Sequence, residues 1–218
     1  MTDNRQEFDR HLDEIEAKVI ELFAMVAEDL PKATEALLAG DTDALTVLAE
    51  REREIDALYP EVEEIASREI LLQAPVAADL RFLLTVLRVV PEIERSHDLV
   101  MQIGSLSRHA LGDDLSSRAR RLVQRMGDLD ASMWRSAADA WYRRDHSAAD
   151  KLHERDEEMD ELRASLIAEL AAGTMALPVT MEMTLASHFY ERLGAHAVNI
   201  ARRVIYLAGK TAPSDADD

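Results

Sequence analysis

The sequence EIERSHDLVMQI at residues 92–103 returns in altered form as FYERLGAHAVNI at residues 189–200. Both stretches carry Glu-Arg at the same place, and both end in an amide side chain followed by Ile. A second pair of phrases, REREIDAL at residues 51–58 and RDEEMDEL at residues 155–162, recurs in the same way. Self-similarity over about 100 residues is typical of an internal duplication. One acid that follows the shared Glu by four residues is missing from the second copy, because Asp98 in the first corresponds to Ala195 in the second.

The composition favours helices, and the net charge disfavours nucleic acid and anionic lipid as partners. The 218 residues are 47% hydrophobic and only 5% aromatic, with few Gly and Pro, which is typical of a helical protein with a substantial core. The formal net charge of −18 disfavours nucleic acid and anionic lipid, because both are bound through Lys and Arg. Basic partners or metal ions suit such a chain better.

The chain also lacks the signals of export and membrane insertion. It contains no Cys, which excludes disulfides and thiolate metal sites. The N-terminal residues MTDNRQEFDRHLDEIE have no basic segment followed by an apolar run, so they are not a signal peptide. No apolar stretch approaches the ~20 residues that span a membrane. We therefore expect a cytoplasmic protein without direct membrane insertion.

Apolar residues spaced three and four apart predict six helices. In the first half, Gly40 is expected to end a long first helix and Asp41 to cap the second. Pro75 is expected in the first turn of the third helix, and Pro178 at the start of the sixth. The second helix is expected to run to about Leu72 and the third to about Ser107. The fourth carries a stripe from Leu115 to Ala140, and the fifth is expected between about Asp145 and Gly173.

A polar segment, GDDLSS at residues 112–117, divides the six helices into two groups of three. The predicted fold is all-α: two tandem three-helix bundles related by internal duplication. We expect repeats at residues 1–110 and 113–210, and a disordered acidic tail at 211–218. Pro31, Pro60 and Pro91 fall inside the helices of the first half, where we expect kinks rather than breaks because the apolar stripes continue past them.

Acidic residues four positions apart occur on the second and third helices of the first half and on the second helix of the second half, whose third helix keeps only Glu191 of the pair. Residues at this spacing share one face of a helix. In each half the two pairs lie equally far from the turn that joins their helices, so an antiparallel arrangement puts them at one level. The candidate metal ligands are Glu52, Asp56, Glu94 and Asp98 in the first half, and Asp156, Asp160 and Glu191 in the second.

Clustered carboxylates repel one another unless cations compensate their charge. Oxygen ligands suit Mg, Ca or Mn, and carboxylate clusters also hold iron, so divalent or iron ions are the expected cofactors. His188, one turn before Glu191, is a candidate substitute for the acid missing at Ala195. A solvated acidic face explains the same spacing without any metal, because acids four apart are common on helix surfaces.

No pattern in the sequence indicates an enzyme. Glu94 and His97 match the Glu-x-x-His pair of di-iron bundles, but Gly194 stands where the second His is needed. The chain contains no Gly-rich phosphate loop and no plausible nucleophile with its base. Trp134 and Trp141, seven residues apart, share one helix face, which indicates core packing or, as the alternative, a partner surface.

Three stretches carry a resemblance to a known family: LLQAPVAADLRFL (71–83), EIERSHDLV (92–100) and FYERLGAHAVNIARRVIYL (189–207). With them the chain resembles the PhoU family over nearly its whole length, and LLQAPVA is similar to actinobacterial members. The family's E/D-x-x-x-D pattern is implicated in multinuclear metal binding at the bundle surface. Glu94 and Asp98 keep that pattern, whereas Glu191 is followed by Ala195.

The resemblance implies a cytosolic accessory protein of phosphate uptake. Such a protein would be a negative regulator of phosphate uptake and of the phosphate-starvation response. It would act as an adaptor between the ATPase subunit of a Pst-type phosphate ABC transporter and a PhoR-type sensor histidine kinase, and we expect a homodimer. The alternative is a metal-binding helical-bundle protein, for storage or metal-dependent catalysis, outside phosphate signalling.

Overall fold

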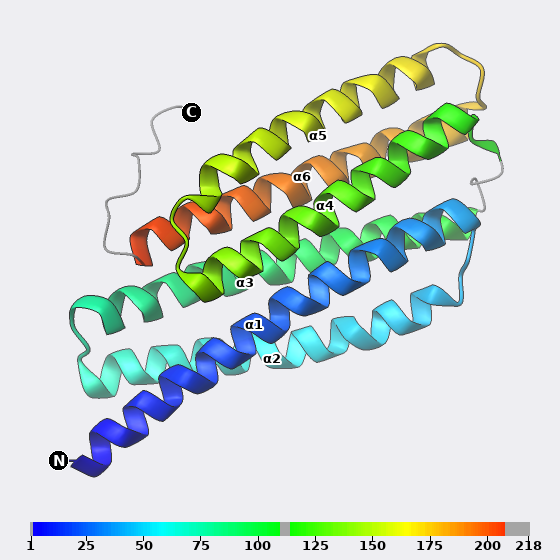
Figure 1. The fold of residues 1–218 in the computed structure, drawn as a ribbon. Coiled ribbons are helices and arrows are strands. Elements are labelled where there is room, and N and C mark those ends of the chain that lie inside the picture. The colour runs from blue at the N-terminus through cyan, green and yellow to red at the C-terminus, as the bar shows by residue number, and fades with distance from the viewer. Residues whose placement is uncertain (1, 110–113, 208–218) are drawn as a thin grey trace.

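The computed structural model describes residues 2–109 and 114–207, which form six α-helices and one 3-10 helix and contain no strand (Figure 1). The first three helices are followed by the 3-10 helix η1 (Leu106–His109), and three more come after it. The α-helices are α1 (Thr2–Ala39), α2 (Ala44–Gln73), α3 (Ala77–Ser105), α4 (Ser117–Arg143), α5 (Ala148–Ala171) and α6 (Leu177–Leu207). The all-α prediction is confirmed.

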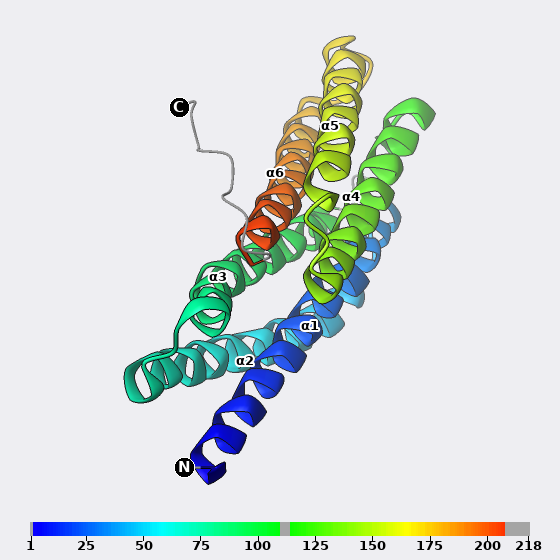
Figure 2. The ribbon, with the colours of Figure 1, turned by 60° about the vertical axis from the view of Figure 1, so that its left-hand side comes forward.

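The helices pack as two three-helix bundles joined side by side. Helices α1, α2 and α3 pack against one another, and so do α4, α5 and α6. Between the bundles, α1 packs against α4 and α3 against α6, while α2 and α5 lie on opposite outer sides (Figures 1 and 2). The predicted pair of three-helix bundles is confirmed. Residues 110–113 and 211–218 lie outside the described residues, so the repeat boundaries and the disordered tail stay predictions.

The helix ends differ in detail from the expected ones. Gly40 has a φ of 66° and follows the last residue of α1, as predicted, because glycine adopts this left-handed conformation without strain. The N-cap of α2 is Asp43 rather than Asp41, whose Oδ1 accepts the backbone N–H of Asp43 at 2.8 Å. Pro75 lies in the turn before α3 rather than in its first turn, and that turn is bounded by positive φ angles at Ala74 and Ala77.

The three prolines of the first bundle lie inside uninterrupted helices. Pro31, Pro60 and Pro91 fall within α1, α2 and α3, so none of them ends a helix. An interior proline costs about 3 kcal/mol in an isolated exposed helix, and packing of the apolar stripes outweighs it here. Leu30, just before the first of these prolines, is fully buried.

The core interpretation of the two tryptophans is confirmed. Trp134 and Trp141 are both fully buried, and each ring centroid lies 6.1 Å from that of Phe23 on α1. The indole Nε1–H of Trp134 donates to the carbonyl oxygen of Leu193 at 3.2 Å. These contacts tie α1, α4 and α6 together at the junction of the bundles. None of the helices in the described ranges is long and apolar enough to cross a membrane.

Candidate functional site

Three of the predicted acids of the first bundle share one place on its surface. Asp56 projects from α2, and Glu94 and Asp98 from α3. Burial and the nearby charge of Asp56 raise the pKa of Asp98. Burial and the charge of Asp98 raise the pKa of Glu94. We call these three residues the first-repeat acidic patch, and its crowding agrees with the spacing of the acids in the sequence.

The acids of the second bundle also lie together, but partners already engage one of them. Burial and the charge of Asp160, with a smaller effect of Glu191, raise the pKa of Asp156. We call Asp156, Asp160 and Glu191 the second-repeat acidic patch. Glu191 Oε2 lies 3.3 Å from Arg163 Nε and 3.1 Å from His188 Nδ1. His188 therefore contacts Glu191 itself, and a cation at Glu191 would compete with two ion pairs.

The side chains of these patches are close but not arranged as a finished metal site. Within residues 2–109 and 114–207, no three His, Asp or Glu side chains lie close enough together to hold one metal ion. Glu52 is half-buried on α2, one turn before Asp56. The donor set, all carboxylate oxygen, still suits hard divalent cations and iron. The seven acids therefore remain predicted ligands, and a bound ion would have to draw them together.

His97 serves the interior of the first bundle. Its side chain is buried, and its Nε2–H donates to Oδ2 of Asp29 on α1 at 3.2 Å. Asp29 also accepts from Lys32 Nζ at 2.8 Å and lies 3.5 Å from Arg51 Nε. Burial opposes ionisation of Asp29, but the hydrogen bonds from His97 and Lys32 outweigh it and hold its pKa below the usual range. The Glu-x-x-His pattern thus places its His against an aspartate that sequence reasoning had not singled out.

The second bundle has an aspartate in the corresponding place, also missed by sequence reasoning. Asp130 of α4 is fully buried, and neither carboxylate oxygen has a hydrogen-bond partner among the described residues. Burial and the charge of Asp156 raise the pKa of Asp130 well above its usual range. Two signals in the sequence could have found it: Asp130 interrupts the apolar stripe between Met126 and Met133, and Gly194 replaces the His of the first copy.

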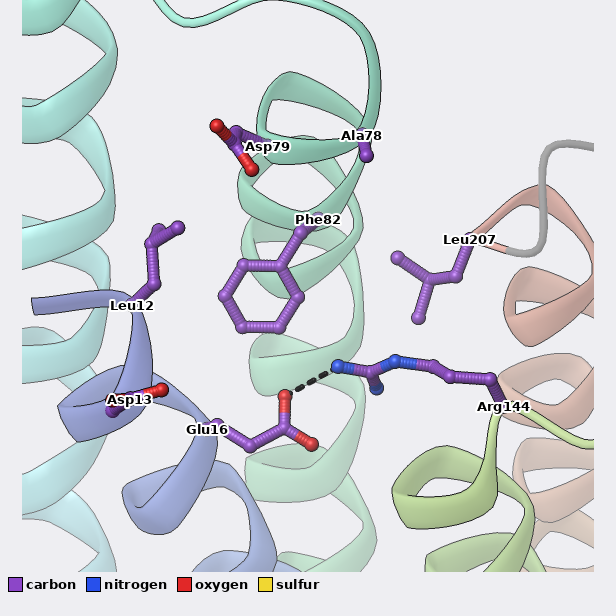
Figure 3. A pocket seen from close by; sticks show the side chains of 8 residues that line it. All are labelled: Leu12, Asp13, Glu16, Ala78, Asp79, Phe82, Arg144 and Leu207. Carbon is purple, nitrogen blue, oxygen red and sulfur yellow. Dashed lines mark hydrogen bonds and ion pairs between the residues drawn. The ribbon is translucent and has the colours of Figure 1, made fainter. Parts of the chain in front are cut away.

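A pocket of about 360 Å³ opens where the two bundles meet, near the C-terminal ends of α4 and α6 (Figure 3). Arg144 crosses it and donates from Nη2 to Glu16 Oε2 at 2.6 Å. Its guanidinium also lies over the rings of Phe82, at 5.4 Å, and Trp141, at 5.1 Å. The described residues that line the pocket are Leu12, Asp13, Glu16, Ala78, Asp79, Phe82, Arg144 and Leu207. Acids outnumber the single base, which is already paired, so the pocket does not suit a phosphate anion.

Polar contacts also join α3 to α6 between the bundles. His196 Nδ1 lies 2.8 Å from Ser96 Oγ, which itself donates to the carbonyl oxygen of Glu92 at 2.6 Å. Burial, together with the positive charges of Arg192 and Arg95, lowers the pKa of His196 to about 4. His196 is therefore neutral near pH 7, and it donates its Nδ1–H to the serine oxygen.

Comparison with known proteins covers most of both three-helix bundles. A family model described as "PhoU domain" matches residues 6–106 and 123–204. The phosphate-specific transport system accessory protein PhoU homolog 2 of Mycobacterium tuberculosis is 29% identical over 94% of this chain and 97% of its own length. The PhoU homolog of Zymomonas mobilis is 30% identical over 94% of this chain and 89% of its own.

Two solved structures share the fold. The crystal structure of PhoU from Pseudomonas aeruginosa matches with a TM-score of 0.87 and 24% identity, over 94% of this chain and all of that one. The phosphate transport system regulatory protein PhoU of Streptococcus pneumoniae matches with a TM-score of 0.85 and 23% identity, over 95% of this chain and 99% of that one. At these identities the structures speak for the fold alone.

Proposed function

The chain belongs to the PhoU family, and from this premise we propose that it is a negative regulator of phosphate uptake and of the phosphate-starvation response. The observation that carries the proposal is the match over both bundles. Curated accessory proteins of phosphate-specific transport systems align with 93–97% of the chain at 28–30% identity. The likeness therefore extends over the complete six-helix arrangement.

The proposed mode of action is that of an adaptor rather than an enzyme. One partner is the ATPase subunit of a Pst-type phosphate ABC transporter, and the other is a PhoR-type sensor histidine kinase. The six-helix arrangement, with α2 and α5 on opposite outer sides, offers two separate faces for docking (Figure 1). The net charge of −18 favours basic surfaces on those partners and acts against nucleic acid. A cytoplasmic location and a homodimer complete the proposal.

Metal ions form a subsidiary part of this proposal. Divalent or iron ions would bind the first-repeat and second-repeat acidic patches and offset their repulsion. The raised pKa values of Glu94 and Asp98, which arise from burial and from their acidic neighbours, support it because a cation relieves that crowding. The ions would tune the charge of the surface and carry no chemical step.

A pull-down tests the adaptor role. The full chain is immobilised and offered the transporter ATPase subunit and the soluble part of the sensor kinase, each from the same organism. We expect retention of both partners, with binding that weakens as salt screens the charges. Retention of neither partner at low salt would overturn the adaptor proposal.

A further inference from the structure

Asp130 is a buried carboxylate without a partner. Its side chain is fully buried in α4, and both Oδ atoms lack a hydrogen bond within the described part of the chain. Burial of an unpaired ionised carboxylate is so unfavourable that native proteins pair, protonate or metallate it. Asp130 therefore requires an explanation that packing alone does not supply.

The first bundle shows how the same position is normally satisfied in this chain. Asp29 of α1 and Asp130 of α4 are equivalent, because His97 and its counterpart Gly194 face them from α3 and α6. Asp29 is surrounded by three basic groups, those of His97, Lys32 and Arg51.

No residue at the three equivalent positions of the second bundle places a basic group against Asp130. The counterparts in the second bundle are Gly194, Met133 and Arg155. Gly194 and Met133 carry no charge, and Arg155 Nη1 donates instead to Ser132 Oγ at 2.7 Å and to Ser136 Oγ at 3.3 Å. The second bundle thus contains the buried acid without the basic groups that compensate its equivalent in the first.

Asp130 points toward the second-repeat acidic patch. A Cβ atom built on Gly194 would lie 3.3 Å from Asp130 Oδ1 and 3.1 Å from Asp156 Oδ1. The space left by the missing side chain is therefore flanked by one oxygen from α4 and one from α5. Asp156 itself is half-buried, and it belongs to the second-repeat acidic patch with Asp160 and Glu191.

We propose that the second bundle binds a hard divalent cation between Asp130 and Asp156, in the space that Gly194 leaves open. Asp130 would supply from inside the bundle the carboxylate that the repeated phrase lost at Ala195. Two carboxylates with water in the remaining positions are a ligand set that Mg²⁺ or Mn²⁺ accepts. The inference concerns the purified chain and does not depend on its regulatory role.

Thermal unfolding with Mn²⁺ as the probe tests the site. The full chain is freed of metal with a chelator and then melted over a range of Mn²⁺ concentrations. An ion that binds only the folded state raises the melting temperature, so we expect a Mn²⁺-dependent rise. Asp130→Asn should weaken the apparent Mn²⁺ affinity by on the order of tenfold or more, because one of two carboxylate ligands is gone.

Two further variants serve as controls for this experiment. Asp29→Asn changes the equivalent acid of the first bundle and should keep the full Mn²⁺ response, whatever it does to the metal-free protein. Gly194→Ala puts a methyl group into the space itself, 3.3 Å from Asp130 Oδ1 and 3.1 Å from Asp156 Oδ1, and it should abolish the response at this site. Asp130→Asn replaces a buried acid that has no hydrogen-bond partner among the described residues, so we expect the metal-free variant to be at least as stable as the original chain.

A local readout separates this site from the first-repeat acidic patch. The chain has two tryptophans, and the indole N–H of Trp134 donates to the carbonyl of Leu193, next to Gly194. Paramagnetic Mn²⁺ at the proposed site should broaden the Trp134 indole signal at lower concentrations than that of Trp141, which lies about 10 Å farther along α4. Equal Mn²⁺ responses of the original chain and Asp130→Asn, in melting and in broadening, would overturn the proposal. No Mn²⁺ response in the original chain would overturn it equally and leave Asp130 protonated.

Discussion

Removal of His97 should expose how strongly the buried Asp29 depends on it. Breaking a buried ionic pair by removing one partner costs about 3–5 kcal/mol. Here Lys32 remains 2.8 Å from one carboxylate oxygen and Arg51 lies 3.5 Å from the other. We therefore expect His97→Ala to lower the free energy of unfolding by less than this, about 2–3 kcal/mol. For a chain of this size that loss lowers the melting temperature by roughly 4–12 °C.

A double-mutant cycle separates the pair from the cavity that His97→Ala leaves. The free energy of unfolding is measured by urea denaturation for the original chain, His97→Ala, Asp29→Asn and the double variant. We expect His97→Ala to cost about 1–2 kcal/mol less in the Asp29→Asn background, because contacting residues couple by this amount. Additive effects, within about 0.5 kcal/mol, would refute the claim that the two side chains compensate each other.

The pH dependence of stability gives the same pair a second signature. Burial opposes ionisation of Asp29, but bonds from His97 and Lys32 bring its pKa below the ordinary value of 3.8. A carboxylate whose folded pKa is lowered stabilises the protein above its unfolded pKa, and this contribution is lost as pH falls through the folded value. The loss of stability below about pH 4 should therefore be smaller in His97→Ala than in the original chain.

Three further changes have expected outcomes. Gly127→Ala should destabilise the protein by about 1–3 kcal/mol, because the new methyl group would collide with the buried side chain of Thr34 where α4 meets α1. Thermal melts measure this loss, and an unchanged melting temperature would contradict the contact. His196 takes up a proton near pH 6.5 in the unfolded chain but only near pH 4 in the folded one, so the urea midpoint of unfolding should fall as the pH drops from about 6.5 to about 4. An equal fall of the urea midpoint in His196→Gln would contradict this assignment. Arg144→Ala should lower the free energy of unfolding by about 1–2 kcal/mol, more than Glu16→Gln does, because it removes the contact with the Phe82 ring as well as the ion pair with Glu16 (Figure 3). Equal losses of stability in the two variants would show that only the ion pair matters.

The helices and their grouping could be predicted because they rest on regular patterns. Apolar residues at steps of three and four specify which helix face is buried, and the repeated phrases specify the pairing of the halves. The exact helix starts were less predictable. Asp41 and Asp43 are equally good cap residues by type, and only the local turn decides that α2 follows the second.

The candidate site could be predicted in part, for a physical reason that its residues illustrate. The spacing of Asp56, Glu94 and Asp98 along two antiparallel helices is enough to bring them together. Asp130 lies on α4 in the second bundle, and its importance depends on which side chains of α5 and α6 face it. The apolar stripe of α4 marks Asp130 as a buried acid, but only the tertiary packing shows that Gly194 stands beside it in place of the partner that the first bundle provides.

The regulatory role can be tested most directly with a phosphate-starvation reporter, such as secreted alkaline phosphatase, in phosphate-rich medium. The activity is compared in the original host, in a host without this gene, and in that host with the gene restored. A negative regulator predicts high reporter activity only when the gene is absent, and repression when the chain is supplied again. Reporter activity that stays low in all three strains would contradict a required role in restraining the starvation response.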